Sequence, residues 1–300
     1  MDFSLWPAAS RRWQDVLEGA EYAERTGWHG VWIADHFMQN GDDLTVPVNE
    51  CLALIAGIVA RTSRVRVGSM VLGNTYRHPA VVANAAATID QMANGRFVLG
   101  IGAGWQVNEH DVYGIELPAI GPRLKRFEEA CQVIKGLLTQ DRTTFDGTYY
   151  QLHDAPCEPK PANLPILIGA SGEKVALGIV ARYADEWNHW GRPELAAQKG
   201  AVFARHCERA QRDPETVRRS AQTFLEVVQP GDSAAAERKT RLESNSAHVI
   251  MGSAQEVLDV VAQYPEAGID ELLVPDAFLG DGNRRFDALE RLREEVLAKV

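Results

Sequence analysis

The chain has 300 residues, of which 45% are hydrophobic and 24% are charged, a composition typical of globular proteins and unlike that of disordered or fibrous ones. Acidic residues outnumber basic residues by 41 to 31, and the net charge of -10 argues against nucleic acid and anionic membrane surfaces as partners, because both are negatively charged. The length does not require a division into domains, so we expect a single domain over residues 1–300.

Short apolar runs rich in β-branched residues alternate with amphipathic helical segments along the chain, which is typical of βαβ units with a parallel sheet. Several runs are almost continuously hydrophobic, as expected for strands buried on both faces. The eight predicted strands are residues 2–6, 30–34, 65–72, 96–101, 165–169, 185–189, 220–228 and 271–274. Because eight parallel strands close a barrel, the predicted fold class is α/β, a (β/α)8 TIM barrel.

The segments between these strands carry helix start and stop signals. Ser10 is predicted to cap the first helix, and Gly27 to end it. Asn94, followed by glycine, is predicted to end a later helix. Ser253 and Glu256 have the spacing of a capping box before another.

Two stretches do not fit a minimal barrel, and we interpret both as insertions. Residues 143–161 contain the turn signal Asp146-Gly147, and residues 230–247 are polar and weakly patterned. Either insertion is compatible with a substrate lid or with a surface loop that has no function.

The four cysteines are Cys51, Cys131, Cys157 and Cys207. They lie far apart and form no C-x-x-C pair, so the sequence predicts neither a metal site nor a disulfide framework, and it fits a reducing cytoplasm. Residues 1–10 lack the features of a secretory signal, and the apolar run 51–60 is about half the roughly 20 residues that cross a bilayer. We therefore expect a soluble cytoplasmic protein.

In a TIM barrel the active site lies at the C-terminal ends of the strands, so polar residues that follow each apolar run are the first candidates. These clusters are Asp35-His36, residues 69–78, residues 102–109 and residues 169–174. A carboxylate beside an imidazole fixes its tautomer and tunes it as an acid or base near neutral pH, so Asp35 and His36 are candidate catalytic residues. The alternative is a structural pair at a strand end.

Glycines follow two of the predicted strands. Gly100, Gly102 and Gly104 resemble a dinucleotide fingerprint, but Trp105 stands where its third glycine would fall, so that reading fails. The glycines instead permit either close approach of a flat ligand or tight packing of strand against loop.

Residues 169–172 precede a helical segment, where free backbone N–H groups can hold a phosphate, and Lys174 adds positive charge. An ordinary helix cap is the alternative. The sequence contains no G-x-S-x-G elbow, no H-E-x-x-H pair and no P-loop, which argues against serine hydrolases, zinc proteases and NTPases.

Taken in chain order, these clusters resemble the bacterial luciferase-like monooxygenase superfamily and, within it, the coenzyme F420-dependent oxidoreductases. The resemblance spans nearly the whole chain, and its specificity comes from the ordered set of motifs. The segments that carry it are residues 15–27, 31–37, 67–71, 76–79, 94–97, 100–105, 108–109, 127–129, 145–149, 165–174 and 181–185.

This resemblance implies a barrel with insertions, usually dimeric, in which a flavin-type ring lies over the strand ends. It implies coenzyme F420 as cofactor, with FMN as the alternative, and a non-prolyl cis peptide bond at or next to Met70-Val71. The catalytic residues it implies are His36, Asp35 and Glu109. The cofactor-binding residues it implies are Ser69, Met70, Val71, Trp105, Asn108, Gly169, Ala170, Ser171 and Gly172.

The function implied is hydride transfer between the deazaflavin and a small organic substrate, with His36 as acid or base. The sugar-phosphate dehydrogenases of this family carry a carboxylate where this chain has Trp105, and the tryptophan predicts a more apolar wall and a less polar substrate. The first alternative is an FMN-dependent monooxygenase that needs a partner reductase. The second alternative is a non-catalytic flavin-binding protein, because proteins that share a fold do not always share a function.

Overall fold

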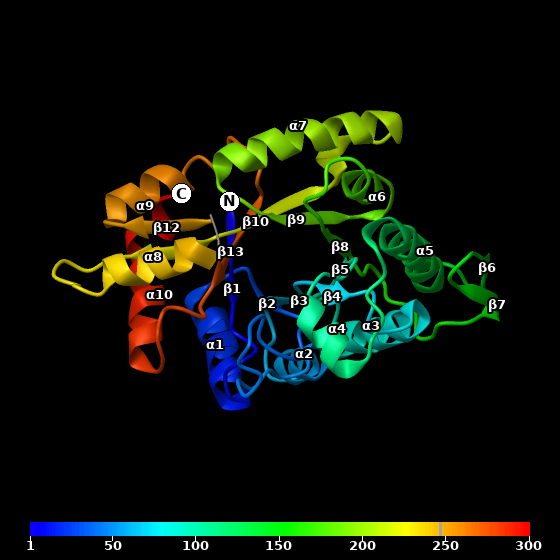
Figure 1. The fold of residues 1–300 in the computed structure, drawn as a ribbon, viewed down its shortest axis with the longest axis horizontal. Coiled ribbons are helices and arrows are strands. Elements are labelled where there is room, and N and C mark those ends of the chain that lie inside the picture. Colours follow the sequence, from blue (N-terminus) through cyan, green and yellow to red (C-terminus); the bar gives the residue numbers. More distant parts are fainter. Residues whose placement is uncertain (246–247) are drawn as a thin grey trace.

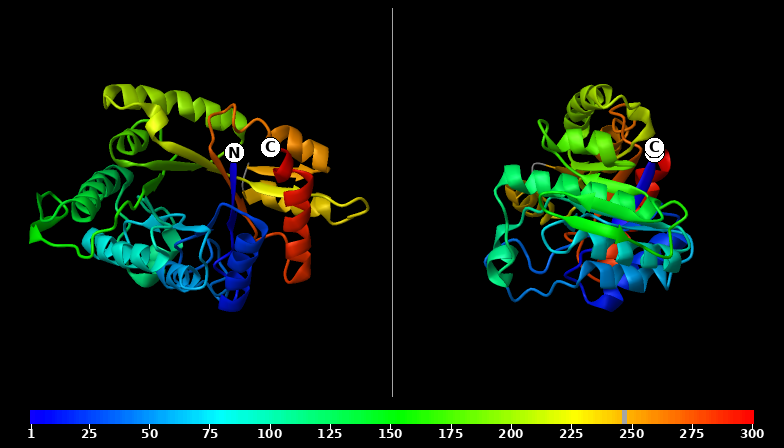
Figure 2. Two further views of the ribbon diagram at one scale, coloured as in Figure 1. Left: turned by 180° about the vertical axis from the view of Figure 1, so that it is seen from behind. Right: turned by 90° about the vertical axis from the view of Figure 1, so that its right-hand side faces the viewer.

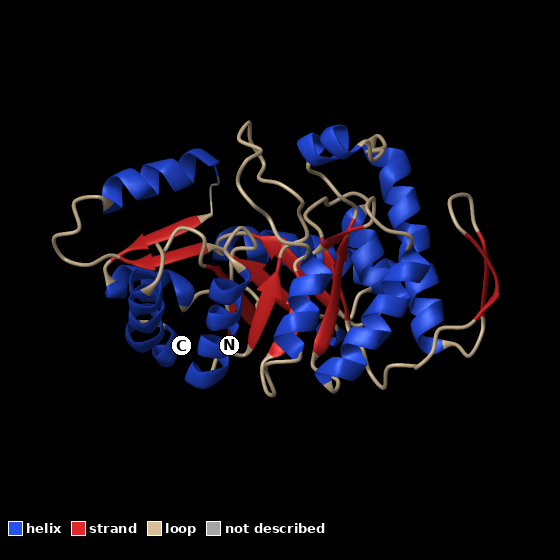
Figure 3. Ribbon diagram, turned by 90° about the horizontal axis from the view of Figure 1, so that it is seen from below, coloured by secondary structure: helices blue, strands red, loops and turns tan. Residues whose placement is uncertain are grey.

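The computed structural model describes residues 1–245 and 248–300. Within these residues, nine parallel strands form a sheet that closes where β3 pairs with β5, and β4 continues β3, so the nine segments occupy eight barrel positions (Figure 3). The barrel strands are β1 (Asp2–Trp6), β2 (Gly30–Ile33), β3 (Arg66–Ser69), β4 (Leu72–Gly73), β5 (Phe97–Gly102), β8 (Ile166–Gly169), β9 (Glu186–Trp190), β10 (Arg218–Gln222) and β13 (Glu271–Pro275). Each of the eight predicted strands overlaps an observed barrel strand, although the predicted strand 65–72 is interrupted between β3 and β4, and the predicted (β/α)8 barrel is confirmed.

Helices surround the barrel and cover its outer face (Figures 1 and 3). They are α1 (Trp13–Thr26), α2 (Cys51–Val59), α3 (Pro79–Ala93), α4 (Val107–Tyr113), α5 (Ile120–Thr139), α6 (Ala176–Tyr183), α7 (Pro193–Arg209), α8 (Ala235–Asn245), α9 (Ala254–Val261) and α10 (Asn283–Glu295), with short 3-10 turns at Pro214–Thr216 and Leu297–Lys299. No helix in the described part of the chain is both long enough and apolar enough to cross a bilayer. The two termini lie close together in every view (Figures 1 and 2).

The helix signals in the sequence are largely confirmed. Gly27 ends α1 with a φ of 83°, and Asn94 ends α3 with a φ of 52°, the left-handed conformation that both positions require. The capping box before α9 is present. The prediction for Ser10 is wrong, because residues 8–11 form a turn and Arg12 occupies the cap position, where its side chain forms an ion pair with Asp15 instead of capping.

The predicted seventh strand, residues 220–228, is two strands in the structure. β10 ends at Gln222, and the chain then leaves the barrel as β11 (Phe224–Val227), which pairs in parallel with β12 (Val249–Gly252). The prediction of one continuous strand is wrong because residues of both halves are buried, and burial does not reveal which partner strand each half takes.

The two predicted insertions lie at opposite ends of the molecule (Figure 1). The first contains a hairpin of β6 (Thr143–Asp146) and β7 (Gln151–Ala155), in which the N–H of Gly147 donates to the carbonyl of Tyr150 across the turn. The second contains α8, and its last two residues, 246–247, lie outside the described residues.

Two apolar clusters make up the core. The larger lies between the barrel and its helices, and the smaller fills the barrel interior with Trp32, Met70, Val98, Leu167 and Leu273. A Cβ atom on Gly68 would lie 2.2 Å from the Trp32 ring, so this glycine makes room for the indole at the centre of the barrel.

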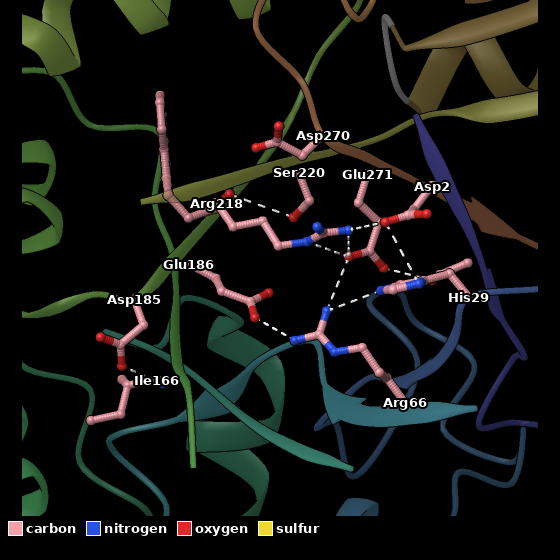
Figure 4. Close-up of polar contacts among 12 residues, drawn as sticks. Asp2, His29, Arg66, Ile166, Asp185, Glu186, Arg218, Ser220, Asp270 and Glu271 are labelled. Atoms are coloured by element: carbon pink, nitrogen blue, oxygen red, sulfur yellow. Dashed lines mark hydrogen bonds and ion pairs between the residues drawn. The ribbon is translucent and has the colours of Figure 1, made fainter. Parts of the chain in front are cut away.

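Charged side chains form a network at the N-terminal ends of the strands (Figure 4). Glu271 is fully buried, and one of its carboxylate oxygens accepts hydrogen bonds from Ser4 Oγ at 2.5 Å and from Trp32 Nε1 at 2.9 Å. Its other oxygen lies 3.4 Å from nitrogens of both Arg66 and Arg218. The network continues through Asp2, His29 and Glu186.

Candidate active site

The C-terminal ends of the strands enclose a cavity of about 970 Å³. Its wall is formed by residues that end or follow seven of the eight barrel positions, from β1 through β10. This volume is typical of sites that hold a cofactor and a small ligand. No described residue of either predicted insertion lines the wall, so these residues do not form a lid over the cavity.

His36 follows β2, and its ring lines the cavity. Its Nδ1 atom lies 3.0 Å from Oε1 of Glu109, and the edge of its ring meets Trp105 at a centroid distance of 5.6 Å. Glu109 lies in the first turn of α4 and is fully buried. The structure therefore fixes the direction in which His36 points, with Nε2 as its remaining ring nitrogen.

Glu109 is held as a carboxylate. Burial by itself raises its pKa, but hydrogen bonds from His36, from the Tyr76 hydroxyl and from the Phe37 N–H bring the pKa below its usual value. An ionised carboxylate only accepts hydrogen bonds, so Nδ1 of His36 carries a proton. In a neutral imidazole, Nε2 is then the atom that can accept a proton from a ligand.

Asp35 is bound by other groups and does not contact His36 through its carboxylate. Arg77 donates to both of its oxygens, at 2.7 and 2.8 Å, and the Gly73 N–H donates at 2.9 Å. Burial lowers the pKa of Arg77, but the ion pairs with Asp35 and Glu50 outweigh it and raise the pKa above its ordinary value. The expectation that Asp35 fixes the His36 tautomer is therefore wrong, because Glu109 occupies that position.

The peptide bond between Met70 and Val71 is cis, as the resemblance implied, and both residues line the cavity. A Cβ atom on Gly102 would lie 2.8 Å from a Val71 methyl group, and one on Gly169 would lie 2.9 Å from it. Of the two roles left open for the Gly100-Gly102 segment, the structure supports tight packing, because the glycines make room for the chain around Val71.

Two of the predicted cofactor-binding side chains lie off the cavity wall. The Ser69 hydroxyl is buried between strands, where it donates to the Gly100 carbonyl at 2.8 Å and accepts from the Gly100 N–H at 3.0 Å. The Asn108 amide donates to the carbonyl of Gln39 at 2.8 Å, because α4 turns this side chain toward the loop that follows His36. The structure does not bring Asn108 to the cavity. Trp105, by contrast, lines it from the rim and is 57% exposed.

The loop that joins β8 to α6 brings Gly169, Ala170, Ser171 and Gly172 to the cavity wall. The structure gives the N–H groups of residues 171–174 no acceptor among the described residues. Lys199 steadies the loop by donating to the Ser171 carbonyl at 2.8 Å. These backbone groups are placed to bind an anion near the start of α6.

Three polar side chains on the cavity wall next to this loop were not identified from the sequence: Asn188 and His189 from β9, and Gln222 from β10. Burial lowers the pKa of His189 to about 4, so its imidazole is neutral at physiological pH. His189 Nε2 and Gln222 Oε1 are buried and have no hydrogen-bond partner among the described residues. The signal available in the sequence was that these polar residues fall within two of the predicted barrel strands, 185–189 and 220–228.

The family model for luciferase-like monooxygenases matches residues 1–241. The chain belongs to the luciferase-like monooxygenase family. The resemblance drawn from the ordered motifs is thereby confirmed at the level of the family.

Curated relatives of this luciferase-like chain include two F420-dependent glucose-6-phosphate dehydrogenases. The one from Amycolatopsis mediterranei (strain U-32) is 38% identical over 174 residues, which is 57% of this chain and 50% of the relative. The one from Kineococcus radiotolerans is 41% identical over 162 residues, which is 53% of this chain and 48% of the relative. The chain thus spans about half the length of the curated relatives it matches.

Solved structures match over nearly the full length. An F420-dependent secondary alcohol dehydrogenase in complex with an F420–acetone adduct has a TM-score of 0.84 and 24% identity, over 99% of both chains. A long-chain alkane monooxygenase has a TM-score of 0.80 and 13% identity, over 99% of this chain and 92% of the other. At these identities the likeness establishes the shared barrel fold.

Proposed function

We propose that this luciferase-like protein is a coenzyme F420-dependent oxidoreductase that catalyses hydride transfer to or from a small, uncharged organic substrate. The observation that carries the proposal is the pair His36–Glu109, which presents an oriented imidazole to a cofactor-sized cavity beside the Met70-Val71 peptide. The curated relatives named for coenzyme F420 support this choice of cofactor.

The residues of the cavity suit a ring system with a polar edge and an anionic extension. His189 Nε2 and Gln222 Oε1 are buried polar atoms without a partner among the described residues, and a ligand with donors and acceptors on its ring would satisfy them. The unbound N–H groups of residues 171–174 would hold a phosphate. Met70 and Val71 would support the face of the ring, with Trp105 at the rim.

When bound, the deazaflavin supplies a two-electron hydride carrier. The protein contributes proton transfer and placement. His36 takes a proton from a substrate hydroxyl at Nε2, or returns it to a carbonyl oxygen in the reverse direction, and Glu109 stabilises the imidazolium that forms. Asp35 forms an ion pair with Arg77 and acts as a positioning residue, because this pair fixes the end of β2, which His36 follows.

The charge of the cavity wall favours an uncharged substrate. Among the described residues that line it, Lys174 is the one lysine or arginine, and it lies beside the loop that we assign to the cofactor phosphate. A sugar phosphate would bring a second anion to a wall of Trp6, Trp105, Leu124 and Trp190 with no further cation to meet it. We therefore propose an alcohol or ketone as the substrate class.

The experiment that tests the function is a titration of the purified protein with coenzyme F420 and with FMN, followed by fluorescence quenching. We expect saturable binding of coenzyme F420 and weak binding of FMN. Turnover is then measured as loss of the deazaflavin's visible absorbance with a panel of secondary alcohols and with glucose 6-phosphate. Tight FMN binding without F420 binding would overturn the cofactor, and a preference for the sugar phosphate would overturn the substrate class.

We further propose that the protein is a homodimer in a reducing cytoplasm. The four cysteines are buried free thiols, which suits a reducing compartment. Apolar side chains such as Val81 and Met92 on α3 are exposed in the single chain and would be covered by a second copy. Sedimentation of the purified protein tests the dimer.

A further inference from the structure

A second cavity, which we call the basic pocket, lies between α6 and α7 and has a volume of about 330 Å³. The two helices run side by side (Figure 1), and the pocket is lined by Lys174, Arg182, His206 and Arg209 together with small or apolar residues. No carboxylate side chain of the described residues lines it. In a chain of net charge -10, this is a local excess of positive charge.

Two of these cations have no partner within the protein. Neither Lys174 nor Arg209 forms a hydrogen bond or ion pair with any described residue. Arg182 pairs with Glu128 at 2.6 Å, and His206 Nε2 lies 2.7 Å from the Glu173 carbonyl, so both are held in place at the wall. Glu173, which precedes Lys174 in the sequence, directs its carboxylate to Lys199 at 3.4 Å.

The basic pocket adjoins the cofactor cavity. Lys174 and Val175 line both, and they lie just after the loop whose free N–H groups suit a phosphate. A ligand that passes this loop with its phosphate therefore reaches the basic pocket next.

We propose that the basic pocket binds the carboxylates of the cofactor's oligoglutamate tail, an inference that rests on the proposed function. Coenzyme F420 carries these carboxylates beyond its phosphate, and each one gains from a nearby unpaired cation. The acidic protein thereby attracts an acidic tail, because its positive charge is concentrated where the tail emerges from the cavity.

The test compares three ligands by fluorescence titration: the deazaflavin without phosphate or tail, the phosphorylated form without glutamates, and the form with several glutamates. Arg209→Gln is expected to weaken binding of the glutamate-bearing form by about two- to fivefold at low salt, with little effect on the other two. Lys174→Gln, at the junction of the cavities, is expected to weaken both phosphorylated forms. The wild-type preference for the longer tail should shrink as salt is added.

The matched control is Arg25→Gln. Arg25 is, like Arg209, an exposed arginine in the last turn of a helix, but α1 lies on the opposite side of the barrel from α6 and α7 (Figure 1). This variant should bind all three ligands as the wild type does. Unchanged thermal unfolding of Arg209→Gln would show that its effect is not a loss of fold.

The possible outcomes separate the two proposals. If Arg209→Gln binds the glutamate-bearing form as tightly as the wild type, or loses the same affinity for the glutamate-free form, the basic pocket is not a tail site. Wild-type protein that binds the deazaflavin regardless of tail length overturns the pocket but leaves the proposed function intact. If no deazaflavin form binds, the proposed function fails and the tail site fails with it.

Discussion

The two ends of the barrel differ in what their polar side chains contact. At the N-terminal ends of the strands, Glu271, Arg66 and Arg218 bind one another and their neighbours in a closed network (Figure 4). At the C-terminal ends, His189 Nε2 and Gln222 Oε1 are buried without a partner among the described residues. Buried atoms without a partner among the described residues also occur at the N-terminal end, and they include Nε of Arg219 and Oε2 of Glu186, whose carboxyl pKa burial raises despite the ion pair with Arg66.

This difference separates stability from function within one fold. Buried charges that are paired with one another hold the strands together and leave no free hydrogen-bonding group for a ligand. A buried polar atom without a partner has lost its hydrogen bonds to water, and a ligand that bonds to it removes that free-energy cost. Mutations at the N-terminal end should therefore affect unfolding, and mutations at the C-terminal end should affect binding and turnover.

The largest expected effect is at His36. His36→Asn removes the proton acceptor, so we expect turnover to fall by about 100- to 10,000-fold. Cofactor affinity and thermal unfolding should stay unchanged, because the ring is partly exposed and makes one hydrogen bond. His153→Asn, at an exposed histidine on β7, is the control. Intact turnover in His36→Asn with normal cofactor binding would contradict the assigned role.

The next largest expected effect is on stability, at Glu271 at the N-terminal end of the barrel. Glu271→Ala leaves the buried donors Ser4 Oγ and Trp32 Nε1 without an acceptor and removes the carboxylate that the partly exposed Arg66 and Arg218 share, so we expect the free energy of unfolding to fall by about 3–5 kcal/mol. Denaturant unfolding measures this. Arg12→Gln, which breaks the exposed pair with Asp15, should leave stability unchanged. A loss of cofactor affinity in the folded Glu271→Ala protein would break the comparison between the two ends.

His189 predicts a pH dependence of stability. Its pKa is about 4 in the folded protein and about 6.5 when unfolded, so its contribution is fully present above pH 6.5 and is lost as the pH falls toward 4. Between these limits we expect the wild type to lose about 3 kcal/mol more than His189→Gln. Denaturant midpoints for both proteins across this range measure the difference in slope. Equal slopes would mean that His189 titrates normally.

The smallest expected effect is at Glu109. Glu109→Gln keeps the side-chain shape but removes the charge that stabilises a protonated His36, and we expect kcat to fall about tenfold while KM changes little. Steady-state kinetics distinguish a fall in kcat at constant KM from a loss of substrate binding. Glu116→Gln, at an exposed glutamate shortly after α4, is the control. A rise in KM with kcat intact would place Glu109 in substrate binding instead.

Much of the site could be predicted because it follows directly from the strand ends. His36, Met70, Val71, Trp105 and residues 169–172 all line the cavity as expected. Each comes just after an apolar run, and parallel strands deliver such residues to the same end of a barrel.

Other parts of the site depend on contacts that no local pattern contains. Asp35 is adjacent to His36 in sequence, yet Glu109, 73 positions away, is the carboxylate that binds its Nδ1 atom. Asn108 was expected at the cavity, but the direction of α4 turns it toward Gln39.

The sequence by itself determined the barrel, the family and the strand ends that carry the site, because hydrophobic periodicity and helix caps are local properties. Only the tertiary structure decided that the chain leaves the barrel after Gln222, that His189 and Gln222 face the cavity, and that Lys174 and Arg209 meet in one pocket. These features depend on which distant segments pack together, and side chains far apart in the chain become neighbours only when the barrel closes.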